Sequence, residues 1–169
     1  MALDFESLAS HDFEHLTETE QDAEWLWNQL VSMIQEVNRN DLLENSPTIL
    51  DLGGRIGEFS KKINEQGINS FSLDKQTIES NSGANQVRAD AYKMPFSDES
   101  FDIVCSNSMF DDLYKIDYSQ LLPEVARILK SKGVLSVVFP NPLPISELEK
   151  YFMLLLSRGK DDATLWEKK

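Results

Sequence analysis

Short apolar runs alternate with amphipathic stretches through the central part of the chain. Five of the apolar runs have the length of strands and are bounded by turn residues, so we interpret them as strands. They span residues 48–52, 69–73, 86–89, 101–105 and 134–139. Between them, residues 56–66 and 119–130 place apolar side chains three and four positions apart, which predicts helices. Nearly continuous apolar strands separated by helices are typical of a parallel sheet that is covered on both faces.

The N-terminal part of the chain has a different pattern. Residues 1–20 are acidic with scattered apolar positions, whereas residues 20–40 carry apolar side chains on one helical face. These side chains are Leu26, Leu30, Met33, Ile34 and Val37. We therefore expect residues 1–45 to form an N-terminal helical arm or lid, and residues 46–169 to form an α/β domain.

The composition restricts the compartment and the partners that we expect. The 169 residues carry a formal net charge of −13, which disfavours binding to nucleic acid or to an anionic membrane surface. No apolar run approaches the roughly 20 residues of a membrane-spanning helix, and the acidic N-terminus does not resemble a signal peptide. Cys105 is the only cysteine, which excludes an internal disulfide and favours the cytoplasm. With only His11 and His15 as further soft ligands, we expect no metal site.

The segment from Thr48 to Phe59 is the most informative local pattern. A short strand ends near Asp51, a turn containing Gly53 and Gly57 follows, and a helix then begins. Glycines let the backbone approach a ligand closely, and the helix start offers N–H groups that have no partner within the helix. This arrangement predicts a site for a nucleotide-like ligand.

Three further polar residues occupy equivalent places in the predicted sheet. Asp74, Asp90 and Ser106 lie at or just past the ends of the second, third and fourth strands. Ligands of doubly wound sheets bind outside the carboxyl ends of the strands, near the point where the strand order reverses. We therefore expect these residues to lie close to Asp51 around one ligand.

Four segments in order resemble the class I S-adenosylmethionine-dependent methyltransferases, in particular the small-molecule enzymes of methyltransferase type 11. They are the glycine turn of residues 49–57, the second strand with its terminal acid over residues 71–74, residues 88–107, and residues 122–133. The third segment is the strongest match, because it runs from an Asp-Ala pair through a Met-Pro-Phe loop into the fourth strand.

The resemblance implies S-adenosylmethionine as the cofactor and assigns its binding residues. They are Asp51, Gly53, Gly57, Asp74, Asp90, Ala91 and Ser106. Asp51 is expected near the amino acid end of the cofactor, and Asp74 is expected to accept both ribose hydroxyls. Asp90 is expected to accept from the adenine amino group, while Ser106 lines the methionine side with Asn107 nearby. No catalytic residue is assigned.

The resemblance also implies a Rossmann-like, doubly wound, mostly parallel sheet in the order 3-2-1-4-5, with helices on both faces. The family usually adds two final strands, but residues 145–157 predict an amphipathic helix and residues 158–169 a polar tail. We therefore expect about five strands. The exposed edge of the fifth strand would then be covered by the N-terminal arm, the last helix or a second subunit.

Two other departures leave the function open at this stage. Arg55 replaces the middle glycine of the family's motif, and either pairs with the cofactor carboxylate, reaches outward, or fills the pocket. Asp111 and Asp112 stand near the place where relatives often carry a histidine. The chain is interpreted as a cytoplasmic methyltransferase acting on a small-molecule acceptor, as a homodimer or with a protein partner. The alternatives are an inactive methyltransferase-like binding or assembly subunit, and an NAD-dependent oxidoreductase.

Overall fold

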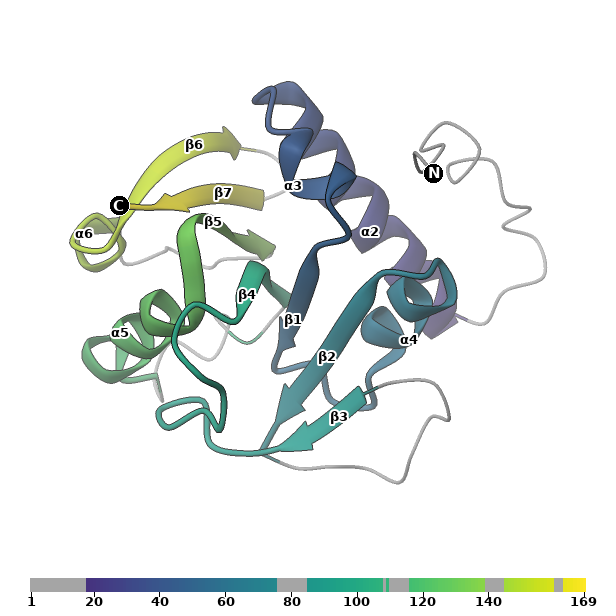
Figure 1. Cartoon of the computed structure of the whole chain (residues 1–169), viewed down its shortest axis with the longest axis horizontal. Coiled ribbons are helices and arrows are strands. Elements are labelled where there is room, and N and C mark those ends of the chain that lie inside the picture. Colours follow the sequence, from purple (N-terminus) through teal and green to yellow (C-terminus); the bar gives the residue numbers. More distant parts are fainter. Residues whose placement is uncertain (1–17, 76–84, 108, 110–115, 139–144, 160–162) are drawn as a thin grey trace.

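A single mixed sheet of seven strands organises the protein, with helices on both of its faces (Figure 1). The computed structural model describes residues 18–75, 85–107, 109, 116–138, 145–159 and 163–169. The strand order is β3-β2-β1-β4-β5-β7-β6. The first five strands, which are parallel, are β1 (Thr48–Leu52), β2 (Asn69–Asp74), β3 (Asn85–Arg88), β4 (Phe101–Asn107) and β5 (Leu129–Val138).

The predicted order 3-2-1-4-5 of these five strands is confirmed, but the prediction that the sheet ends there is wrong. The chain continues into β6 (Phe152–Arg158) and β7 (Ala163–Lys168), and β7 pairs antiparallel with both β5 and β6. The edge of β5 is therefore covered by β7, not by an arm, a helix or a second subunit. The apolar run in β6 has no period-two alternation, so its pattern fits a helix as well as a strand.

Helices pack on the two faces of the sheet and divide the core into two clusters. The helices are α2 (Glu18–Glu36), α3 (Asp41–Glu44), α4 (Glu58–Glu65), α5 (Tyr118–Ile128) and α6 (Ile145–Leu148). Residues of α2, α3 and α4 pack against one face with Ile49, Ile103 and Cys105, whereas residues of α5 and α6 pack against the other face. Cys105 is buried within the first cluster.

Helix α2 is held against the rest of the domain by apolar packing and by ion pairs. Trp27 is 1% exposed and belongs to the same cluster as the β1 and β4 side chains. Glu24, which is also buried, forms an ion pair with Lys62 of α4. At the far end of α2, the guanidinium of Arg158 in β6 donates to the Glu36 carboxylate at 2.7 Å. In the predicted arm or lid of residues 1–45, residues 18–36 form α2, and residues 1–17 lie outside the described residues.

Among the described residues, none of the helices combines the length and the apolar character that crossing a membrane requires.

We predict that Trp27→Ala lowers the free energy of unfolding by about 3–5 kcal/mol, because it leaves a cavity between α2 and the sheet. Urea denaturation followed by circular dichroism would measure the change. Ile145→Ala is the control, since this side chain is 53% exposed and its truncation should cost at most about 0.5 kcal/mol. A loss below about 1 kcal/mol for Trp27→Ala would show that α2 is a detachable arm.

Candidate functional site

The turn between β1 and α4 is held against the end of β2 by backbone hydrogen bonds. The N–H groups of Gly53 and Gly54 both donate to the Leu73 carbonyl, at 2.8 and 3.3 Å. Gly53 has φ +80 and Gly57, the N-cap of α4, has φ +79, and both values favour glycine. A Cβ on Gly53 would lie 2.8 Å from the Met109 Cβ. The turn therefore needs its glycines both for conformation and for space.

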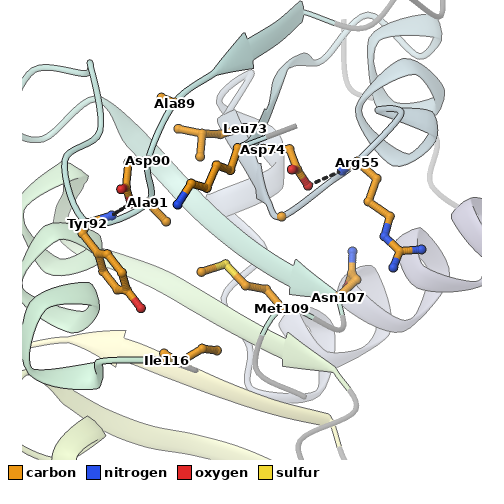
Figure 2. A pocket seen from close by; sticks show the side chains of 12 residues that line it. Arg55, Leu73, Asp74, Ala89, Asp90, Ala91, Tyr92, Asn107, Met109 and Ile116 are labelled. Atoms are coloured by element: carbon orange, nitrogen blue, oxygen red, sulfur yellow. Dashed lines mark hydrogen bonds between the residues drawn. The ribbon is translucent and has the colours of Figure 1, made fainter. Parts of the chain in front are cut away.

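Arg55 and Asp74 connect this turn to the acid at the end of β2. Arg55 lies between the two glycines with φ +47, so it too adopts the left-handed conformation. Its backbone N–H donates to Oδ2 of Asp74 at 3.0 Å, as Figure 2 shows. The Arg55 side chain thus does not prevent the turn from forming, and the turn itself positions the Asp74 carboxylate.

Asp51 lies beneath the turn in an environment that disfavours its charge. The side chain is 2% exposed, and a Cβ on Gly54 would overlap its carboxylate. Desolvation by burial, and secondly the nearby Asp74 carboxylate, raise the pKa of Asp51 to about 7. Burial also raises the pKa of the neighbouring Cys105 thiol, and Asp51 adds to that effect. Asp51 therefore changes its charge near neutral pH.

The segment after β3 carries a further acid of the site, Asp90, which is exposed. Oδ1 of Asp90 accepts from the Tyr92 N–H at 3.0 Å, and the Lys93 N–H donates to the Asp90 carbonyl at 3.0 Å. The Tyr92 hydroxyl in turn accepts from the Asp117 N–H at 2.9 Å, which fixes the ring beside the start of α5. These contacts hold Asp90, Ala91 and Tyr92 in one rigid turn.

Two residues of α5 support that segment from behind, and sequence reasoning assigned them no role. The Arg127 guanidinium donates to the carbonyls of Phe96 and Met94 and pairs with Glu124, whose carboxylate also accepts from the Met94 N–H. The hydrogen bond from Arg127 lowers the pKa of Glu124. Both residues lie in segment 122–133, which carries the family resemblance. Their positions in that motif were the sequence signal that could have pointed to a supporting role.

A cavity of about 590 Å³ opens at the carboxyl ends of β1 to β4. Four of the seven predicted site residues line it, namely Gly53, Asp74, Asp90 and Ala91. The other three, Asp51, Gly57 and Ser106, are buried behind this lining. The lining also includes Arg55, Lys75, Tyr92, Asn107, Met109 and Ile116. The structure thus brings the turn and two of the strand-end acids together at one pocket.

The two ends of the pocket differ in chemistry. Figure 2 shows Asp90 and Tyr92 at one end and Arg55 with Asn107 at the other. At the second end, the Asn107 Nδ2 is buried and has no hydrogen-bond partner within the part of the chain that the structure describes. The Ser106 Oγ, which does not line the pocket, is also buried without such a partner. Asp111, Asp112, His11 and His15 lie outside the described residues.

A family model for a methyltransferase domain matches residues 50–137, a little more than half of the chain. The chain belongs to the class I S-adenosylmethionine-dependent methyltransferase family. The match covers the glycine turn, both strand-end acids and the α5 residues that support the second of them. Membership of this family also excludes the interpretation of the chain as an NAD-dependent oxidoreductase. No match was found among curated protein sequences.

Solved structures share the fold at low sequence identity. A TehB-like S-adenosylmethionine-dependent methyltransferase from Corynebacterium glutamicum has a TM-score of 0.62 at 16% identity, over 89% of this chain and 98% of its own. A 1,6-didemethyltoxoflavin-N1-methyltransferase from Burkholderia thailandensis, solved with S-adenosylhomocysteine and its substrate, has a TM-score of 0.61 at 14% identity, over 94% and 98%. A protein from Pyrococcus horikoshii has a TM-score of 0.61 at 18% identity, over 85% and 91%.

The residues present fit S-adenosylmethionine, the cofactor of this family. A Cβ at Gly53 would clash with Met109, which lines the pocket, so glycine at this position leaves room between the turn and the cavity. The Asp74 and Asp90 carboxylates of the lining can accept from hydroxyl and amino donors such as a nucleoside carries, and the buried Asn107 Nδ2 at the opposite end has no acceptor within the described residues. The pocket therefore offers complementary chemistry along the length of such a molecule.

We predict that Asp51→Asn stabilises the ligand-free protein increasingly as the pH rises. The folded-state pKa of about 7 exceeds the ordinary 3.8, so folding takes up a proton between these values and stability falls as the pH rises through them. Asparagine does not titrate, so the variant avoids this loss. Its free energy of unfolding should therefore exceed that of the wild type by a margin that grows by about 2–3 kcal/mol between pH 5 and pH 8.

Urea denaturation at several pH values would measure this gain. The matched control is Asp22→Asn, because Asp22 is exposed on α2. A gain of the same size at pH 5 and pH 8 would contradict a raised pKa for Asp51.

Proposed function

We propose that this protein transfers the methyl group of S-adenosylmethionine to a small-molecule acceptor. The observation that carries the proposal is that one pocket combines the glycine turn with Asp74 and Asp90 from two neighbouring strand ends. A scaffold that had lost its ligand would gain nothing from two acids held in place by backbone N–H groups. The net charge of −13 supports a small molecule over a nucleic acid as the acceptor.

In this proposal each end of the pocket binds a different part of the cofactor. Asp74 accepts the ribose hydroxyls, because a carboxylate can accept several hydrogen bonds beside the one from the Arg55 N–H. Asp90 accepts from the adenine amino group, and the Ala91 N–H faces a ring nitrogen. Gly53 and Gly57 let the turn follow the amino acid part, with Asp51 and Ser106 behind it.

The cofactor supplies a methyl group that is already activated on its sulfonium. The protein then has to align the acceptor with that methyl group and exclude competing water, which is catalysis by proximity and orientation. The arm of residues 1–45 and the connections after β4 and β5 are the segments that we propose contact the acceptor.

We predict that Asp74→Asn weakens binding of S-adenosylhomocysteine on the order of tenfold to hundredfold. Asparagine keeps an oxygen for the Arg55 N–H, so the turn is preserved, but it loses the charge that strengthens the bonds to both hydroxyls. Isothermal titration calorimetry of the purified protein would measure the dissociation constants. Asp22→Asn on α2 serves as the control and should bind like the wild type.

The same titration tests the alternative of an inactive binding or assembly subunit. Micromolar binding of S-adenosylmethionine to the wild type would support the enzyme and justify a search for the acceptor. A folded sample that binds neither S-adenosylmethionine nor S-adenosylhomocysteine at millimolar concentration would contradict the proposed function.

We further propose that a second copy of the chain pairs along β6. This strand lies at the edge of the sheet, contains no acidic residue, and exposes half of Met153 and 44% of Leu154. Size-exclusion chromatography with light scattering should therefore give twice the chain's 19.3 kDa, and Met153→Lys should shift the mass to that of one chain. A monomeric wild type would contradict this assembly.

A further inference from the structure

Arg55 combines an unfavourable backbone conformation with a guanidinium that has no anionic partner among the described residues. Its φ of +47 lies in a region that side chains with a Cβ rarely adopt. Arg39, Arg127 and Arg158, in contrast, each form ion pairs with carboxylates. Arg55 is exposed and lines the pocket, so its side chain is accessible to a ligand there.

Asn107 brings a second donor to the same end of the pocket. It lies at the end of β4, it lines the cavity, and its Nδ2 is buried without a hydrogen-bond partner in the described part of the chain. Figure 2 shows Asn107 and Arg55 together at the end opposite Asp90 and Tyr92. A guanidinium and an amide NH2 can only donate, so the group that satisfies both is an acceptor, and a carboxylate can accept from both at once.

We propose that Arg55 and Asn107 bind the carboxylate of the cofactor's amino acid group. This assignment rests on the proposed function, which places the nucleoside at Asp74 and Asp90 and so directs the amino acid group toward the opposite end. A guanidinium binds a carboxylate through two parallel hydrogen bonds, which a carboxylate at the end of a flexible ligand can reach readily. The arginine at the middle position of the glycine motif is then a binding residue and not an obstruction.

The strain at Arg55 agrees with this role. Glycine would form the same turn without a steric penalty, yet the chain keeps a cation there. In a chain of net charge −13, that cation offsets the negative potential around an anionic ligand group.

The test compares two ligands that differ only in this carboxylate, namely S-adenosylmethionine and decarboxylated S-adenosylmethionine. Calorimetry would measure both dissociation constants for the wild type, Arg55→Gly and Arg55→Lys. Arg55→Gly should weaken S-adenosylmethionine on the order of tenfold to hundredfold and leave the decarboxylated ligand within about twofold. Arg55→Lys should fall between, because lysine keeps the charge but lacks the planar fork.

Lys132→Gly is the matched control. Lys132 is also an exposed cation with a positive φ, +61, but it is not among the residues that line the pocket. It lies two residues before Val134, which pairs with Ile103 of β4, and Ile103 is four residues from Asn107 along that strand. This variant should bind both ligands like the wild type, so it separates the local contact from a change in net charge or backbone strain.

The outcomes distinguish this assignment from the proposed function. If the wild type binds S-adenosylmethionine but Arg55→Gly binds it equally or more tightly, the carboxylate assignment is overturned and the function stands. Equal weakening of both ligands would also overturn it, because Arg55 would then shape the turn without contacting the carboxylate. Failure of the wild type to bind either ligand would overturn the proposed function, and the assignment with it.

Discussion

The parallel register of β1 and β2 is the constraint on which the rest of the site depends. The two strands pair in step from Thr48 with Asn69 to Leu52 with Leu73, so the turn after β1 leaves the sheet beside the end of β2. Backbone N–H groups of the turn then bind the Leu73 carbonyl and the Asp74 carboxylate. The contacts that shape the glycine turn thereby also fix the acid that faces the pocket.

Because Asp51 is buried under this turn, the electrostatics of the site depend on whether the Asp51 carboxyl is protonated. Desolvation and the Asp74 carboxylate both disfavour the ionised form, and no described cation is close enough to offset them in the pKa of Asp51. A positively charged ligand group near the turn acts in the opposite direction, because an opposite charge favours the carboxylate. Binding of a sulfonium or an ammonium would therefore be linked to release of a proton, and the ligand-free state carries the cost of the buried acid.

Sequence patterns gave the five parallel strands and four of the pocket-lining residues, because these features have local signals. Apolar runs mark buried parallel strands, and an acid at a strand end lies at the same edge as its neighbours. The final strand pair has no such signal. The apolar residues of β6 form a continuous run without alternation, and the burial of β7 depends on its pairing with β5. The role of Arg127 also depends on contacts between distant segments, which periodicity does not report.

The structure changes what Arg55 implies about activity. From the motif alone, a side chain at the middle glycine position is consistent with a blocked pocket and with an altered one. In the folded protein the turn is intact at Arg55, because its backbone adopts the conformation that glycine would adopt and its N–H binds Asp74. The cavity beside it remains about 590 Å³ in volume. The arginine therefore gives no reason to regard the pocket as lost.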